Sequence, residues 1–256
     1  MQEIQIDLSK AEVLARREHK VIYRYENCAV KVFDSNFSKA DILNEALNQA
    51  RVEEVFKDIP KVLEVGKYDG RWAIVSEYIS GPTLGDLMAQ NPEKEAEYLE
   101  RFINLQNRIL NIKPPMLNKL IDKMQGKVSK TELQATVRYE LHMRLNAMAH
   151  QDKLCHGDFC PSNIICCENG HDYVIDWAHV TRGNAEADVA RTYLVFILAG
   201  KKDLAEKYVQ KYCEMTDTAR QQVQKWMPIV AASQSVKKHP EERELLFKWA
   251  NITDFS

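Results

Sequence analysis

The chain has 256 residues, 45% of them hydrophobic and 28% charged, which is enough to bury a sizeable core in one large domain or two small lobes. Its formal net charge is −2, so no basic excess points to nucleic acid as a partner. The most apolar stretch, residues 193–200, is far shorter than the roughly 20 residues of a membrane span, so no membrane association is expected.

Two further features predict a cytoplasmic protein. The first ten residues contain no basic segment followed by an apolar run, so they do not resemble a secretory signal. The six cysteines include no CxxC pair, which disfavours a zinc or redox motif. Reduced, mostly buried thiols are therefore expected. The sequence does not predict an oligomeric state.

The first third of the chain is expected to form strands and one helix. Two hairpins are predicted: residues 21–25 and 28–33 flank Glu26-Asn27, and residues 61–68 and 71–79 flank Asp69-Gly70. Between them, Ser38 is followed three residues later by Asp41, a spacing typical of a helix start. Four apolar residues then recur at helical spacing, namely Leu43, Ala46, Leu47 and Ala50.

The composition changes at Ser80-Gly81-Pro82, which predicts a connector. Helices are expected after it over residues 94–112, 116–125, 130–151, 186–199, 201–214, 217–235 and 240–250, with a kink or break at Pro228. A β-rich island, residues 154–177, interrupts them. The predicted fold class is α+β, with a small β-rich lobe (1–79), a hinge at about 77–82 and a larger, mainly helical lobe (80–256).

The island contains the residues best suited to chemistry. After the loop His156-Gly157-Asp158, residues 164–165 and 173–175 are expected to form two strands around a turn at Asn169-Gly170. This places Asp158, Asn163 and Asp176 at the open ends of one hairpin. One carboxylate of such a cluster can accept a hydroxyl proton, while a carboxylate and an amide oxygen can bind Mg²⁺.

The spacing of this island resembles the kinase catalytic loop, in which Asp is followed five positions later by Asn. The His-Gly-Asp form and the later Ile-Asp-Trp resemble the aminoglycoside phosphotransferase and choline kinase superfamily, which has a protein-kinase-like fold. The resemblance implies that Asp158 is the catalytic base, that Asn163 and Asp176 bind Mg²⁺, and that His156 braces the loop. It also implies ATP or GTP as the phosphoryl donor.

Ala29-Val30-Lys31-Val32 resembles the kinase strand V-A-I-K. The resemblance implies that Lys31 binds the nucleotide phosphates, although the strand alone is also compatible with a surface lysine. A glutamate on the following helix should hold this lysine. Glu45 is favoured because it shares a helical stripe with apolar residues, and Glu53 and Glu54 are the alternatives.

The segment from Ser76 to Gly81 resembles the hinge of the superfamily, which implies that the backbone around Glu77 and Ile79 binds adenine. The loop expected to cover the phosphates, residues 15–20, contains no glycine. Arg17 or Lys20 is a candidate to supply positive charge there instead, and a solvated basic turn is the alternative.

Asp188 lies near a predicted helix start and is expected to support the structure first and contact substrate second. The leading functional hypothesis is a kinase that phosphorylates a hydroxyl of a small molecule, such as an aminoglycoside, choline or a sugar. The alternatives are a kinase of a protein or protein-bound sugar, a nucleotide-binding pseudokinase or regulatory module, and a hydrolase with a metal pair. The sequence contains no concentrated acidic block that would select a cationic acceptor.

Overall fold

The computed structural model of the chain describes residues 6–251, so half of the N-terminal decapeptide discussed above lies outside it. The described residues pack into two compact units. The first unit contains residues 6–90 and 161–179, and the second contains residues 91–160 and 180–251. The lobe boundary expected near residues 77–82 stays a prediction.

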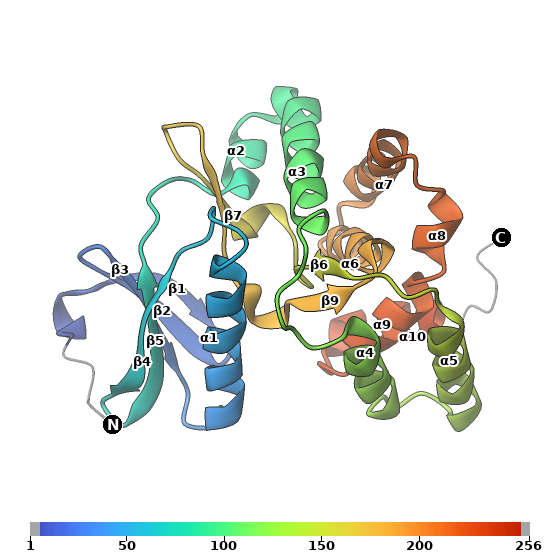
Figure 1. Ribbon diagram of the computed structural model, residues 1–256, viewed down its shortest axis with the longest axis horizontal. Coiled ribbons are helices and arrows are strands. Elements are labelled where there is room, and N and C mark those ends of the chain that lie inside the picture. Colours follow the sequence, from blue (N-terminus) through green and yellow to red (C-terminus); the bar gives the residue numbers. More distant parts are fainter. Residues whose placement is uncertain (1–5, 252–256) are drawn as a thin grey trace. The chain divides into compact units, whose positions relative to one another are not determined.

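The first unit is built on a five-stranded antiparallel sheet with the order β1-β2-β3-β5-β4 (Figure 1). Its strands are β1 Glu12–Arg17, β2 Lys20–Tyr25, β3 Cys28–Phe33, β4 Val62–Tyr68 and β5 Arg71–Glu77. Both predicted hairpins are confirmed, since Tyr25 pairs with Cys28 and Tyr68 with Arg71. Asp69 and Gly70 both have positive φ, 48° and 72°, as the favoured two-residue hairpin turn requires.

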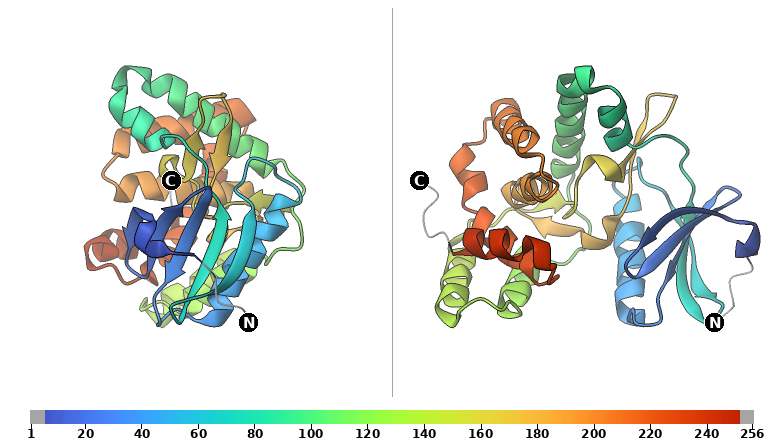
Figure 2. Two further views of the ribbon diagram at one scale, coloured as in Figure 1. Left: turned by 90° about the vertical axis from the view of Figure 1, so that its left-hand side faces the viewer. Right: turned by 180° about the vertical axis from the view of Figure 1, so that it is seen from behind.

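Helix α1, Lys39–Glu53, lies against one face of this sheet (Figures 1 and 2). Phe33 of β3 packs there with Ile42 and Ala46 of α1. On the opposite face, Val30 and Val32 pack in a second buried cluster. The two-residue period of β3 therefore directs Lys31, which lies between these valines, to the same face as Phe33.

The start of α1 is as predicted, because the Ser38 side chain accepts a hydrogen bond from the Asp41 amide at 3.1 Å. The helix buries the stripe that contains Ile42 and Glu45. Leu43 and Leu47, which helped to predict the helix, are 39% and 46% exposed. The spacing of these leucines correctly predicts a helix, but it does not show which face of the helix is buried.

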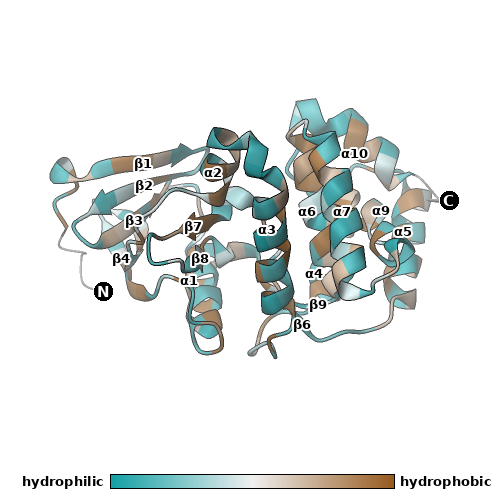
Figure 3. Ribbon diagram, turned by 90° about the horizontal axis from the view of Figure 1, so that it is seen from above, coloured by the Kyte–Doolittle hydropathy of each residue, from teal (hydrophilic) through white to brown (hydrophobic). Residues whose placement is uncertain are grey.

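The rest of the first unit comprises α2, Leu84–Gln90, and a short hairpin of β7, Ile164–Cys166, and β8, Asp172–Val174. The hairpin was predicted, whereas α2 was not. Strand β7 is among the hydrophobic segments in Figure 3 and pairs with the connector, because the Cys166 amide donates to the Pro82 carbonyl at 2.9 Å. A side chain at Gly81 would meet the Cys166 carbonyl oxygen at 2.4 Å, so this contact requires glycine.

The second unit is mainly helical. Its elements are α3 Glu95–Leu110, α4 Leu120–Ser129, α5 Ala135–Ala147, β6 Lys153–Cys155, β9 Thr181–Gly183, α6 Ala185–Leu198, α7 Lys202–Thr216, α8 Arg220–Gln224, α9 Met227–Ser235 and α10 Arg243–Ala250. Aromatic side chains form much of its core, where Phe102 contacts Phe159, Phe196 and Tyr208 with ring centroids 4.6–5.9 Å apart. Within residues 6–251, every helix is too short or too polar to cross a bilayer.

Several helix boundaries differ from the prediction, for example that of the helix expected over 130–151, which spans Ala135–Ala147. The helix expected from residue 116 begins at Leu120, because Lys119 is extended and forms a parallel bridge with Arg182. The helix expected over 217–235 is divided into α8 and α9, with Pro228 in the first turn of α9, as the predicted break at this proline requires. All six cysteines are free, as expected.

Candidate active site

Lys31 is the centre of an ion network in the first unit. Its Nζ donates to Glu45 Oε1 and lies 3.5 Å from Asp176 Oδ1. The Lys31 and Glu45 side chains are only 18% and 9% exposed. Burial by itself lowers the pKa of Lys31, but the carboxylates of Asp176 and Glu45 outweigh it and raise the pKa above its usual value. The lysine is therefore held as a cation.

Glu45 is the glutamate that pairs with Lys31, as the ranking of three candidates anticipated. Glu53 is engaged elsewhere, since its Oε1 accepts from the Val62 amide at 2.7 Å at the start of β4. Burial raises the pKa of Glu53, and the hydrogen bond from Val62 opposes that shift.

Lys20 brings a second cation to the network. Its Nζ lies 3.7 Å from Asp176 Oδ2, and its side chain is 19% exposed. Burial and then the charge of Lys31 lower the pKa of Lys20. The expectation of a loop over residues 15–20 is corrected here, because Arg17 and Lys20 pair across β1 and β2 and leave a two-residue turn. Strand pairing therefore directs Lys20 toward Asp176.

Asp176 and Asn163 are brought together by backbone bonding. The amide of Ile175 donates to the carbonyl of Asn163 at 2.9 Å, which ties the residue before Asp176 to Asn163. Asp176 has a φ of 63°, a conformation that aspartate tolerates better than most residues. The next residue, Trp177, is buried and its indole donates to the Val174 carbonyl at 2.9 Å. These contacts hold Asp176 in its unusual backbone conformation.

This donor set fits magnesium. Asp176 supplies a carboxylate and Asn163 an amide oxygen, which are hard ligands of the kind Mg²⁺ prefers, and Mg²⁺ commonly takes only one or two protein ligands beside phosphates and water. Among residues 6–251, no group of three or more His, Cys, Asp or Glu side chains forms a metal cluster. The two-ligand arrangement is consistent with that finding, because it requires only one acidic residue.

At the predicted hinge, two amides are already used within the sheet. The Glu77 amide donates to the Lys61 carbonyl at 3.0 Å, and the Tyr78 amide donates to the Asn27 carbonyl at 2.8 Å. The carboxylate of Glu77 also accepts from the Lys61 amide at 3.1 Å. Adenine binding by this segment would therefore use the Glu77 carbonyl and the Ile79 amide, which stays a prediction.

In the second unit, the loop that carries Asp158 is braced from within. The Asp158 amide donates to His156 Nδ1 at 3.2 Å, and the Gly157 amide donates to Asp188 Oδ1 at 2.7 Å. His156 and Asp188 are both buried. Burial raises the pKa of Asp188, while His156 and the hydrogen bonds from Gly157 and Gln106 oppose the shift. Both side chains therefore make the contacts expected of loop supports.

Helix α6 adds two further contacts to this loop. Arg191 Nη2 donates to Asp158 Oδ1 at 3.0 Å, and the Thr192 hydroxyl donates to the Phe159 carbonyl at 2.8 Å. Asp188, Arg191 and Thr192 are spaced three and four residues apart, so they share one face of α6. The carboxylate of Asp158 is therefore oriented by an arginine, and Thr192 holds the backbone of the next residue.

The charge of the same carboxylate affects two lysines of α4. Burial, followed by the charges of Lys127 and Arg191, lowers the pKa of Lys123 to about 7, while Asp158 and Asp188 oppose the shift. Burial, Arg191 and Lys237 lower the pKa of Lys127 to about 8, opposed by Asp158. Sequence reasoning missed these two lysines and Arg191. The signals that could have identified them were helical spacings, because Lys123 and Lys127 are four residues apart and Arg191 follows Asp188 by three residues.

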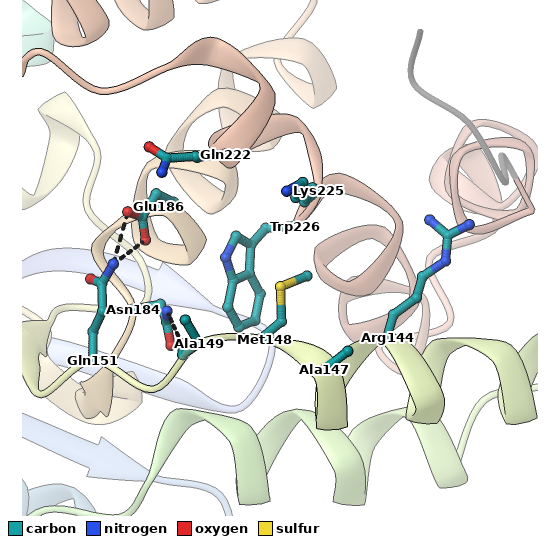
Figure 4. A pocket seen from close by; sticks show the side chains of 10 residues that line it. All are labelled: Arg144, Ala147, Met148, Ala149, Gln151, Asn184, Glu186, Gln222, Lys225 and Trp226. Atoms are coloured by element: carbon teal, nitrogen blue, oxygen red, sulfur yellow. Dashed lines mark hydrogen bonds between the residues drawn. The ribbon is translucent and has the colours of Figure 1, made fainter.

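A pocket of about 450 Å³ occupies another part of the second unit (Figure 4). Trp226 and Met148 contribute apolar surface, and Gln151 donates to both carboxylate oxygens of Glu186 at 2.9 and 3.0 Å. Asn184 is tied to the Ala149 carbonyl at 2.7 Å. None of the predicted site residues lines this pocket, so it is distinct from the proposed catalytic residues.

The architecture is that of the protein-kinase-like fold. Solved structures with this fold include a thermostable mutant of aminoglycoside phosphotransferase APH(4)-Ia, with a TM-score of 0.69, 14% identity and 95% of each chain covered. Choline kinase LicA from Streptococcus pneumoniae has a TM-score of 0.58 and 19% identity over 96% of this chain and 88% of that one. A choline/ethanolamine kinase family protein from Mesorhizobium loti has a TM-score of 0.62 and 15% identity, over 93% and 85%.

The model of one sequence family matches residues 43–226, a segment that includes Glu45, Asp158, Asn163 and Asp176. The chain therefore belongs to the phosphotransferase enzyme family (APH), as the motifs indicated. No curated protein sequence matches it significantly.

Proposed function

We propose that this protein is a Mg²⁺-dependent phosphotransferase that transfers the γ-phosphoryl group of ATP or GTP to a hydroxyl of a small molecule. The observation that carries the proposal is the Lys31 network, in which a buried lysine is held between Glu45 and Asp176. A cation fixed in this way can bind nucleotide phosphates without losing its orientation. Membership of a phosphotransferase family supports the same activity.

In the proposed site, Lys31 and Lys20 bind phosphate oxygens and Glu45 keeps Lys31 in place. The Glu77 carbonyl and the Ile79 amide bind the adenine edge. Asn163 and Asp176 would hold Mg²⁺, which neutralises charge on the phosphates when it is bound. These roles use oxygen and nitrogen donors of the first unit only.

Asp158 acts on the acceptor. Its carboxylate accepts the hydroxyl proton as the acceptor oxygen forms a bond to the γ-phosphorus and the bond to the nucleoside diphosphate breaks. Arg191 fixes the orientation of the carboxylate through Oδ1, and His156 and Asp188 fix the backbone beneath it. The second unit thus supplies the base and its supports.

A small-molecule acceptor is supported by the relatives of known structure. A mutant of APH(4)-Ia was solved as a ternary complex with AMP-PNP and hygromycin B, and LicA is a choline kinase. From these proteins we infer only the class of reaction, which is the nucleotide-dependent phosphorylation of a hydroxyl group on a small molecule.

The proposal is tested by thermal unfolding with and without ATP and Mg²⁺, which needs no acceptor. A ligand at one hundred times its dissociation constant stabilises a protein by about 2.7 kcal/mol, which shifts the unfolding midpoint by several degrees. Asp176→Ala should lose the Mg²⁺-dependent part of that shift. Asp172→Ala, which removes a carboxylate from the neighbouring hairpin, is the matched control and should retain it.

A Mg²⁺-dependent shift in the control, lost in Asp176→Ala, would support the nucleotide site and its metal ligand. If neither ATP nor GTP shifts the midpoint of the unmodified protein, the proposed function is wrong.

A further inference from the structure

The carboxylate of Asp176 faces two lysines of the first unit, one at each of its oxygens. Lys31 Nζ lies 3.5 Å from Oδ1, and Lys20 Nζ lies 3.7 Å from Oδ2. Lys31 also donates to Glu45, so its charge is shared between two carboxylates. The aspartate that is expected to bind Mg²⁺ therefore already has a second cation, Lys20, beside one of its oxygens.

Strand pairing sets the position of Lys20. This lysine pairs with Phe33 across β2 and β3, so the two side chains lie on the same face of the sheet. Lys31 precedes Phe33 by two residues on β3 and lies on that face as well. The turn between β1 and β2 is only two residues long, and the Asp34 amide donates to the His19 carbonyl at 2.9 Å. The backbone thus fixes Lys20 on the face that carries Lys31.

A second cation at Asp176 has a consequence for the metal. Kinases commonly bind two Mg²⁺ ions at an aspartate and an asparagine, and each ion needs oxygen ligands. An ammonium group 3.7 Å from Oδ2 competes with an ion for that oxygen, and its charge repels a divalent cation. The Lys20 and Asp176 side chains are 19% and 34% exposed, so water screens this repulsion only in part. The charges around Asp176 therefore favour a single Mg²⁺.

We propose that Lys20 takes the place of one of these two ions, so that this phosphotransferase uses a single Mg²⁺. This inference rests on the proposed function, because it concerns the nucleotide site of that reaction. The ammonium group of Lys20 neutralises phosphate charge that a second ion would otherwise neutralise, and its three N–H donors suit phosphate oxygens. It also explains how residues 15–20 can act at phosphates without a glycine, since a charged side chain replaces the close approach of backbone amides.

The test counts bound metal ions, with Mn²⁺ as a paramagnetic substitute for Mg²⁺ that accepts the same oxygen ligands. The protein is kept in excess over AMP-PNP and above its dissociation constant for it. Mn²⁺ is then added while the electron paramagnetic resonance signal of the free ion is recorded. The unmodified protein should bind one Mn²⁺ per AMP-PNP. Lys20→Ala should bind two, because Asp176 Oδ2 no longer has a lysine beside it.

The matched control is Lys67→Ala, which removes an exposed lysine from β4 of the same sheet and should bind one Mn²⁺ per AMP-PNP. Lys20→Arg keeps the positive charge and should also bind one. A urea unfolding transition shows whether each variant folds, and Lys20→Gln replaces Lys20→Ala if the alanine variant does not.

A second readout is the affinity for AMP-PNP, measured by thermal unfolding at several Mg²⁺ concentrations. At low Mg²⁺, Lys20→Ala should bind AMP-PNP about tenfold more weakly than the unmodified protein, because it loses a charge-assisted contact to phosphate. Raising the Mg²⁺ concentration should restore most of this affinity, since a second ion then supplies the missing charge. The affinity of Lys67→Ala should follow that of the unmodified protein throughout.

Three results would overturn the inference and leave the proposed function intact. Two Mn²⁺ per AMP-PNP in the unmodified protein would show that Lys20 replaces no ion. One Mn²⁺ per AMP-PNP in a folded Lys20→Ala variant would show that Lys20 is not what excludes the second ion. A loss of AMP-PNP affinity in Lys20→Ala that Mg²⁺ does not restore would show that no ion can substitute for the lysine. A protein that binds no AMP-PNP loses the proposed function, and the inference with it.

Discussion

The charged residues around Lys31 and those around Asp158 are arranged in opposite ways. In the first unit, Lys31 and Lys20 meet the carboxylates of Glu45 and Asp176 at hydrogen-bonding or ion-pair distances. In the second unit, burial and then the charges of neighbouring cations lower the pKa of both α4 lysines. The first arrangement therefore stabilises the charge of its central lysine, whereas the second disfavours the charge of its lysines.

The largest expected effect is on turnover. Asp158→Asn should lower phosphoryl transfer by about 10²–10⁴-fold, because the amide cannot accept the hydroxyl proton. Nucleotide binding by the first unit should be unchanged. The measurement is transfer from γ-labelled ATP to an accepted hydroxyl compound, beside the AMP-PNP-induced thermal shift. Asp152→Asn, an exposed carboxylate of the same unit, is the control, and equal rates in the two variants would remove Asp158 as the base.

A second prediction concerns the Lys31 network. Lys31→Met should destabilise the protein by about 1–3 kcal/mol, because it leaves the buried carboxylate of Glu45 without its lysine. The double variant Lys31→Met/Glu45→Gln should recover part of this loss. Urea unfolding of both single variants and the double variant gives the coupling energy. Additive effects would mean that the pair contributes nothing to the fold, and retained ATP affinity in Lys31→Met would remove Lys31 from the nucleotide site.

A third, smaller effect is expected at the α4 lysines. Lys127→Gln should stabilise the protein slightly at neutral pH, by about 0.5 kcal/mol or less, because it removes a charge that burial, and then Arg191 and Lys237, disfavour. The contrast with Lys31→Met distinguishes a lysine whose charge the fold stabilises from one whose charge it disfavours.

The pH dependence of this effect has a definite sign. The pKa of Lys127 is lowered to about 8 in the folded protein, so between about pH 8 and 10.5 the unfolded chain binds more protons at this site than the folded chain. The free energy of unfolding contributed by Lys127 therefore rises with pH in this window. The advantage of Lys127→Gln over the unmodified protein should shrink as the pH rises from 8 to 10, with Lys113→Gln as the exposed control. A constant difference would contradict the assigned charge interactions.

Much of the fold followed from local patterns in the sequence. The Asp69-Gly70 turn, the Ser38 cap and the hairpin after Asn163 each depend on a few adjacent residues, and the structure confirms them. The missed features depend on distant partners. Strand β9 exists because it pairs with β6, and α4 begins late because Lys119 forms a bridge with Arg182.

The residues of the candidate site also fall into two groups, those that sequence motifs identified and those that they did not. Motifs identified Lys31, Asp158, Asn163 and Asp176, because the chemistry of phosphoryl transfer restricts those residue types and spacings. Motifs did not identify the lysines of α4, because they lie more than 30 residues before Asp158 and belong to no recognised motif.

The contrast between the two regions is tested most directly by thermal unfolding of two variants with and without Mg²⁺ and AMP-PNP. Lys31→Met should lose the shift that the nucleotide produces in the unmodified protein. Lys123→Gln/Lys127→Gln should keep that shift. If both variants lose the shift, or if neither variant loses it, the Lys31 network is not the nucleotide site and the account is wrong.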